Sequence, residues 1–96
     1  MTEPLSRPAE TVGPVLQAGE TARALVQAIQ AANQQSEIID RGGYVRILVP
    51  GKCVLNRVDV ERILGRQFLL PGDLEIIMPS FKGCLTVNEN QAVWET

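Results

Sequence analysis

Residues 20–33 contain the longest helical repeat in the sequence. Apolar side chains recur there at three- and four-residue spacing, with polar side chains opposite them, and the apolar positions are Ala22, Leu25, Val26, Ile29 and Ala32. Glu20 favours the positive end of the helix dipole, and the polar run "NQQS" that follows competes for backbone hydrogen bonds and ends the helix. The sequence therefore predicts one long amphipathic helix, and the rest of the core must come from shorter elements.

Turn residues divide the remaining chain into short segments. Gly42-Gly43 and Pro50-Gly51 separate three predicted strands between residues 37 and 56, because Pro followed by Gly suits the centre of a type II turn. In the middle strand, alternation places one set of side chains on the core face and the other on a face that is only partly covered. The first set is Val45, Ile47 and Val49, and the second is Tyr44, Arg46 and Leu48.

A second, shorter helix is predicted over residues 57–64, with Asn56 as its N-cap and Gly65 closing it. Three strands are predicted after it, at residues 74–80, 84–88 and 92–95, and one strand at residues 11–16 precedes the long helix. Pro14 lacks a backbone donor, so this first strand is expected at a sheet edge.

The resulting element order is β-α-β-β-β-α-β-β-β, which predicts an α+β fold. We expect a single compact domain in which two helices pack on small antiparallel sheets. Residues 1–10 contain Pro4 and Pro8 among polar residues and have no periodicity. They are therefore predicted to form a flexible N-terminal arm, with residues 11–96 as the folded domain.

The composition removes most enzyme classes. The 96 residues include no His, so the usual general base and the commonest metal ligand are both missing. Cys53 and Cys84 lack metal-ligand spacing, and both are expected to be small core or strand residues. We predict no catalytic residue, no metal site and no cofactor.

Charge and hydropathy exclude two classes of partner. The net charge is −2 and the nine basic residues are scattered singly, so neither a nucleic acid nor a membrane surface is expected to bind. No apolar run is long enough to cross a bilayer, and the N-terminus lacks the pattern of a secretory signal. We expect a cytoplasmic bacterial protein with reduced thiols, monomeric when free.

Two aromatic residues are candidates for more than packing. Trp94 is expected to hold the last strand against the core, which is the usual place for a large ring near a chain end. Phe81 lies between Ser80 and Lys82 in a predicted turn, where a ring has no backbone role. Two interpretations stay open for Phe81: the ring folds beneath the sheet, or it belongs to a contact surface.

The motifs "VGPVLQAGE", "DRGGYVRI", "LGRQF" followed by "DLEI", and "PSFKG" resemble, in this order, the effector proteins of bacterial multicomponent diiron monooxygenases. The similarity runs from Val12 to Trp94 and is greatest to the toluene 4-monooxygenase and alkene monooxygenase branch. It implies a cofactor-free, non-catalytic regulatory protein that binds a separate diiron hydroxylase. Such a protein modulates the hydroxylase's conformation, oxygen activation, coupling and regiospecificity in the oxidation of aromatics or alkenes. The resemblance also implies that residues of one segment bind the hydroxylase, namely Ile77, Pro79, Ser80, Phe81 and Lys82.

A small ligand-binding or enzymatic α+β domain is the alternative. It would need a convergent polar pocket, and the residues available to line one are Asp40, Tyr44, Arg46 and Glu75. An electron-transfer subunit is excluded, because two cysteines cannot hold an iron–sulfur cluster that needs four ligands. The resemblance leaves the hydrocarbon substrate open, since another polypeptide selects it.

Overall fold

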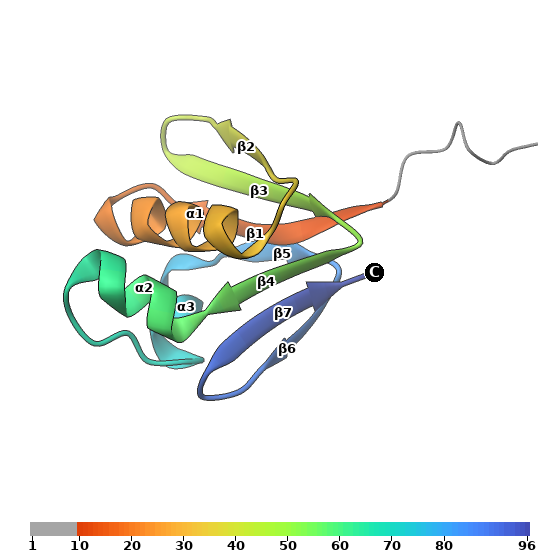
Figure 1. Cartoon of the computed structure of the whole chain (residues 1–96). Helices are drawn as coiled ribbons and strands as arrows, with labels where there is room; N and C mark the ends of the chain where they lie inside the picture. Colours follow the sequence, from red (N-terminus) through yellow and green to blue (C-terminus); the bar gives the residue numbers. More distant parts are fainter. Residues whose placement is uncertain (1–9) are drawn as a thin grey trace, which may run out of the picture.

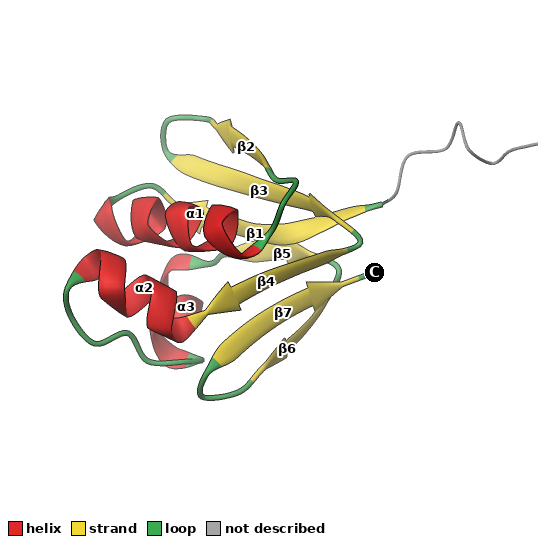
Figure 2. Cartoon of the chain, in the orientation of Figure 1, coloured by secondary structure: helices red, strands yellow, loops and turns green. Residues whose placement is uncertain are grey.

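The computed structural model describes residues 10–96 and folds them into two antiparallel sheets, with the helices toward one end of the molecule (Figure 1, Figure 2). In chain order the elements are β1 (Thr11–Gln17), α1 (Glu20–Ala32), β2 (Glu37–Asp40), β3 (Tyr44–Pro50), β4 (Lys52–Asn56), α2 (Arg57–Leu64), α3 (Gly72–Ile77), β5 (Ser80–Lys82), β6 (Cys84–Val87) and β7 (Gln91–Glu95). The α+β class is confirmed, with one helix more than predicted. The predicted flexible arm covers residues 1–10, and residues 1–9 of it lie outside the described part of the chain.

The larger sheet has the strand order β2-β3-β1-β5, and the smaller one has the order β4-β7-β6. The chain crosses between the sheets at two glycines with positive φ, Gly51 between β3 and β4 and Gly83 between β5 and β6. The Gly51 N–H donates to the Glu10 carbonyl at 2.8 Å, and the Thr96 N–H donates to the Gly51 carbonyl at 3.3 Å. Both ends of the described chain are therefore tied to the β3–β4 corner.

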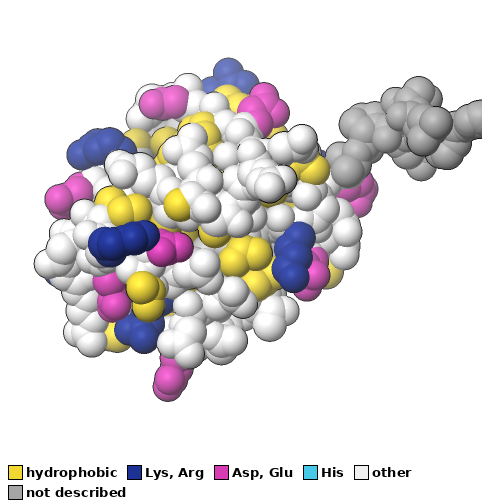
Figure 3. All heavy atoms as spheres, viewed as in Figure 1, with side chains coloured by type: hydrophobic (Ala, Val, Ile, Leu, Met, Phe, Trp, Pro, Cys, Tyr) yellow, Lys and Arg dark blue, Asp and Glu magenta, His cyan; other side chains and the backbone are white. Residues whose placement is uncertain are grey.

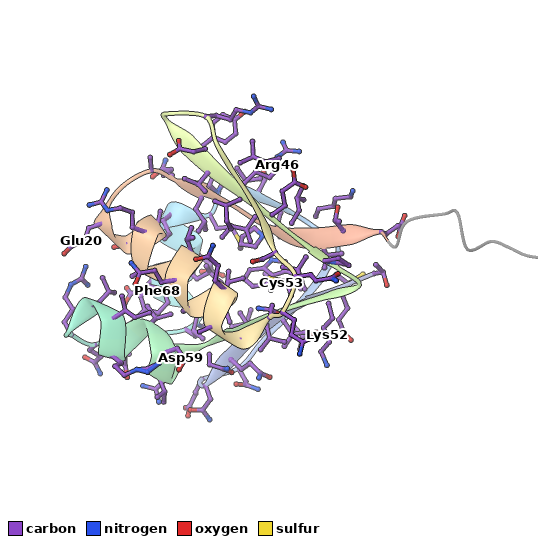
Figure 4. All side chains as sticks on the ribbon, turned by 45° about the horizontal axis from the view of Figure 1, so that its top comes forward. Glu20, Arg46, Lys52, Cys53, Asp59 and Phe68 are labelled. Carbon is purple, nitrogen blue, oxygen red and sulfur yellow. The ribbon has the colours of Figure 1, made fainter. Side chains whose placement is uncertain are left out.

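The core joins α1 to both sheets and to α2. The predicted inner face of β3 is confirmed, because Val45, Ile47 and Val49 are buried while Tyr44 and Arg46 are exposed. Trp94 is also fully buried in β7, as predicted, and is paired in register with Cys53 of β4. Figure 4 shows Cys53 and Phe68 within the body of the molecule and Arg46 at its periphery. The largest buried side chains are Trp94, Phe68, Leu16, Leu25, Ile29, Ile47, Leu55 and Leu74.

The short helix α2 begins and ends where the sequence predicts. Asn56 is its N-cap residue, although its side chain accepts a hydrogen bond from Gln91 Nε2 at 3.0 Å and does not cap the helix backbone. Gly65 closes the helix in the left-handed conformation, with φ of 74°. No helix of residues 10–96 is long and apolar enough to span a membrane.

The strand predicted at residues 74–80 is wrong, because α3 occupies most of it. Asp73 organises the start of this helix: its backbone N–H donates to the Leu69 carbonyl, and its carboxylate accepts from the Leu69 N–H at 2.8 Å. Leu74 is fully buried, and Ile77 packs against the core three positions later, which is a helical spacing. The β-branched residues Ile76 and Ile77 favour a strand by propensity, but burial of one face of the helix outweighs that preference.

The edge position predicted for the first strand is also wrong, because β1 lies between β3 and β5. The pairing of β1 with β3 passes from Val12–Val49 to Val15–Arg46 and skips the two residues between them, Gly13 and Pro14. Pro14 is therefore tolerated inside the sheet, at a point where the ladder between β1 and β3 is interrupted and no backbone donor is required there.

Both cysteines lie on strands, within the prediction of core or strand positions, and Cys84 is exposed. Leu85 and Val87 are the partly buried residues of β6 and pack against the core. Because side chains alternate along a strand, Cys84 must point the other way. Cys53 is buried, as predicted.

Candidate partner-binding site

The strand β5 carries three of the five predicted contact residues on an exposed sheet edge. It pairs with β1 through Gly13–Lys82, Pro14–Phe81 and Val15–Ser80, and all three β5 side chains are exposed. Phe81 keeps 44% of its surface accessible. Of the two interpretations left open for this ring, the surface position holds, and Phe81 lies on a strand rather than in a turn.

The remaining two predicted residues lie just before this strand. Pro79 is exposed, whereas Ile77 is half-buried against the core at the end of α3. The residue with the largest exposed apolar surface in the region is Ile76, with 74% of its surface accessible. Ile76 does not stand out in the sequence, because a strand at residues 74–80 gives no reason to prefer it over its neighbours. The helical spacing of Leu74 and Ile77 is the signal that would have placed Ile76 on the outer side.

A hollow of about 200 Å³ lies beside Phe81 on the larger sheet. We call it the basic hollow, and its lining consists of Gly13, Val15, Arg46, Leu48, Ser80, Phe81 and Lys82. The two charged side chains in this lining, Arg46 and Lys82, are both basic. Alternation along the strand predicts Arg46 on its partly covered face, but no sequence pattern relates Arg46 to Phe81, which is 35 positions further along the chain.

The polar pocket required by the alternative function is not assembled. Of its four candidate lining residues, only Arg46 belongs to the basic hollow. The Asp40 carboxylate instead accepts a hydrogen bond from the Gly42 N–H at 2.8 Å, which is a turn contact between β2 and β3. Within the described residues, no group of three or more Cys, Asp and Glu side chains could hold a metal ion.

The two cysteines differ in chemical state. Burial raises the pKa of the Cys53 thiol from 9.0 to about 12, because the thiolate would lose its hydration. Cys53 is therefore a packing residue with little nucleophilic character at neutral pH. Cys84 is exposed and lies two residues after Lys82.

The face formed by α1 and α2 differs from the β5 edge in the side chains that it exposes. In Figure 3 it carries interspersed acidic and basic side chains, and its hydrophobic areas are small and separate. β5 lies behind this face in the same view (Figure 1). The strand β5 therefore lies away from the face that α1 and α2 form.

Comparison with known proteins places this fold in a family. The MmoB/DmpM family matches residues 10–95. The chain is 41% identical over 85 residues to the effector subunit of the alkene monooxygenase system of Xanthobacter autotrophicus (strain ATCC BAA-1158 / Py2), and the match covers 86% of this chain and 83% of the relative.

Two solved structures have the same fold. A chain in a complex of phenol hydroxylase with its regulatory protein superposes with a TM-score of 0.77 at 25% identity, over 91% of this chain and all of that one. Regulatory protein B of soluble methane monooxygenase superposes with a TM-score of 0.66 at 23% identity, over 88% of this chain and 64% of the longer one.

Proposed function

Because the chain belongs to the MmoB/DmpM family, we propose that it is the effector subunit of a multicomponent monooxygenase and regulates a separate diiron hydroxylase. It is a regulatory and not a catalytic subunit, as its relatives are named effector or regulatory proteins. The observation that carries the proposal is 41% identity to an alkene monooxygenase effector subunit over 83% of that protein's length. The same relative favours an alkene as the substrate class of the complete system.

An effector of this kind acts through differential binding. If it binds one conformation of the hydroxylase more tightly than another, it shifts the population toward that conformation. The size of the shift is limited by the ratio of the two affinities, and a ratio of about 10⁴ is needed to reverse a 1:99 population. Oxygen activation, coupling and regiospecificity then change without any reaction on the effector itself.

The proposed contact surface is the 76–82 segment, which contains the five predicted residues Ile77, Pro79, Ser80, Phe81 and Lys82 together with Ile76. Its support is the exposure of two large apolar side chains, Phe81 and Ile76, within six positions of each other. Aromatic residues covered by a partner commonly supply much of the binding energy of an interface. Ile77 contributes mainly by anchoring the end of α3 to the core.

We also propose the extent of the effector domain and the cellular compartment of the protein. Residues 11–96 form the effector domain, and the family match over residues 10–95 supports this boundary. Cys53 and Cys84 form no disulfide in the described chain, which is the state expected in a reducing compartment such as a bacterial cytoplasm.

The direct test is reconstitution of a monooxygenase that lacks its own effector. The alkene monooxygenase system of Xanthobacter autotrophicus, prepared without its effector subunit, supplies one recipient, and a diiron hydroxylase from the source of this chain would supply a second. Adding the protein is expected to raise the rate of alkene oxidation saturably, with the native Xanthobacter effector as positive control. The proposal fails if neither hydroxylase binds the protein and neither rate changes.

A further inference from the structure

The basic hollow contains two cations, Arg46 and Lys82, that form no ion pair within residues 10–96. Its lining combines the side chains of Arg46 and Lys82 with the apolar side chains of Val15 and Leu48 and the hydroxyl of Ser80. Phe81 borders the hollow at the strand edge, but it lies between Ser80 and Lys82, so its ring points to the other face of the sheet. The ion pairs formed within residues 10–96 are Arg57–Glu61 and Arg62–Asp59, and neither involves the hollow. This concentration of positive charge contrasts with a chain whose net charge is −2.

The sheet register explains how the two cations meet. Arg46 of β3 is paired with Val15 of β1, and Val15 is paired in turn with Ser80 of β5, so these three residues form one row across the sheet. Lys82 is paired in register with Gly13, and both residues line the hollow. The hollow therefore lies above β1, with one cation on each side.

The size of the hollow suits a single side chain. Pockets for drug-sized ligands have volumes of roughly 300 to 1,000 Å³, and the basic hollow has about 200 Å³. It is also open to solvent at Phe81 and Arg46, both of which are exposed. A protruding residue of a partner protein therefore fits it better than an enclosed small molecule.

A partner that covers the 76–82 segment would also cover the cations of the hollow, because Lys82 belongs to that segment and Arg46 lines the same hollow. Removing a charge from water is costly unless an opposite charge or several hydrogen bonds compensate it. A partner surface that covers this segment by apolar contact alone would leave Arg46 and Lys82 desolvated and unpaired. The partner must therefore supply an acceptor at this position, and a carboxylate matches the two-pronged donor geometry of a guanidinium.

We propose that the hydroxylase inserts an acidic side chain, Asp or Glu, into the basic hollow. Its carboxylate pairs with the Arg46 guanidinium and with the Lys82 ammonium, while its methylene groups contact Val15 and Leu48. This inference rests on the proposed function, since it assumes that the partner covers the 76–82 segment. It adds a charge requirement, which makes the contact selective for partners with a carboxylate at one position.

The competing explanation is that Arg46 only covers the sheet. Long basic side chains often lay their methylene groups on apolar surface and keep the charge in water. In that case the sign of the charge at position 46 would have no specific effect on binding. The two explanations therefore predict different results for charge reversal.

The experiment measures Kd for the hydroxylase with matched charge reversals. Arg46→Glu and Lys52→Glu each change the net charge by the same amount, and Figure 4 shows Arg46 and Lys52 on different parts of the molecule. Arg46→Glu is expected to weaken binding about 10²-fold or more, as for a covered charge pair, and Lys52→Glu only by a few-fold. Arg46→Met keeps the stem without the charge and should weaken binding by about tenfold or more, and Arg46→Lys should fall between it and wild type.

A second measurement identifies the acidic residue. A carbodiimide joins an amine to a carboxylate that lies in contact with it, so the complex should yield a cross-linked peptide that contains Lys82 and an Asp or Glu of the hydroxylase. Replacing that residue by Lys should restore binding to Arg46→Glu.

The outcomes separate the inference from the proposed function. If wild-type protein fails to bind the hydroxylase, the proposed function is wrong and the inference falls with it. If wild type binds and the three variants Arg46→Glu, Arg46→Met and Lys52→Glu bind as tightly as wild type, the inference alone is overturned. The same holds if all three variants weaken binding by the same factor. Cross-links that involve other lysines but never Lys82 would overturn it as well. Melting curves check that each variant is folded, which is expected because Arg46 is exposed.

Discussion

The side-chain amide of Asn33 pairs with both backbone polar groups of Val54, donating to the carbonyl oxygen at 2.9 Å and accepting from the N–H at 3.0 Å. This is the pattern by which one strand pairs with the next, here made by a single side chain against one edge of β4. The same Nδ2 also donates to the Ile29 carbonyl at 2.6 Å, in the last turn of α1. Asn33 therefore joins the end of the long helix to the smaller sheet. It pairs with the free edge of β4, whose other edge is paired with β7.

Replacing Asn33 by Ala should destabilise the fold through this junction. Leaving part-buried backbone groups without partners costs about 1–3 kcal/mol per group, so the free energy of unfolding should fall by at least about that amount. Asn33→Asp keeps the acceptor but loses the donor, and should be intermediate. Urea denaturation provides the measurement, and Gln34→Ala, at the exposed neighbouring position, is the control. Equal stability of Asn33→Ala and Gln34→Ala would mean that the amide pairing is unimportant.

The fold class, the long helix and the inner face of β3 were predictable because each depends on local periodicity. Ala22, Leu25 and Ile29 repeat at helical spacing, and Val45, Ile47 and Val49 alternate. The position of β1 was not predictable from Pro14, because tolerance of Pro depends on where the ladder is interrupted, and that is a property of the paired strand. Helix α3 was missed because six residues give too short a window for a helical repeat to compete with β propensity.

The candidate site was predictable in one of its two parts. Phe81 stands out in the sequence because a ring among turn residues lacks a backbone reason. The basic hollow could not be predicted, because Arg46 and Lys82 are brought together only by the β3-β1-β5 strand order. Such an order depends on long-range pairing, for which a single sequence contains no direct signal.

Gly83→Ala should be the most damaging of the glycine substitutions at sheet crossings. A Cβ at this position would lie 2.8 Å from the Glu95 carbonyl oxygen and 2.8 Å from Val12 Cγ1, and φ is +105°. Backbone strain of about 1–2 kcal/mol and overpacking of about 1–3 kcal/mol should add. Gly42→Ala is the matched control, because φ is +86° there and a Cβ would meet nothing within 4 Å. Chemical denaturation should show the larger loss for Gly83→Ala, and equal losses would show that the close contacts relax at no cost.

The two cysteines should differ strongly in reactivity. In the native protein at about pH 8, a thiol reagent is expected to modify Cys84 rapidly and Cys53 only after unfolding, because Cys53 is buried with a pKa near 12. Mass spectrometry of the modified peptides measures this, with denatured protein as the control in which both thiols react. Rapid modification of Cys53 in folded protein would mean that β4 opens readily.

The raised pKa of Cys53 also has a consequence for stability at alkaline pH. In the unfolded chain the thiol loses its proton around the ordinary value of 9.0, whereas in the folded protein it keeps the proton until about pH 12. Above pH 9 the folded state therefore binds more protons than the unfolded state, so stability should fall as the pH rises from 9 to 12. Cys53→Ala should flatten this part of the pH dependence, as measured by denaturation at several pH values.

Phe81→Ala should separate binding from folding. Covering a Phe side chain contributes roughly 1.5–3 kcal/mol of apolar transfer free energy, so removing the ring should weaken hydroxylase binding by about one to two decades. Because Phe81 keeps 44% of its surface exposed in the free protein, its loss should lower the melting temperature little. Val58→Ala is the matched control, since Val58 is a 64% exposed apolar residue on α2, outside the 76–82 segment. It should leave both Kd and the melting temperature near the wild-type values. The opposite result has two parts: Phe81→Ala melts many degrees lower, with a loss of stability near the 3–5 kcal/mol typical of a buried ring, and the remaining folded protein binds and stimulates the hydroxylase normally. In that case Phe81 serves the fold, and the 76–82 segment is not the contact surface.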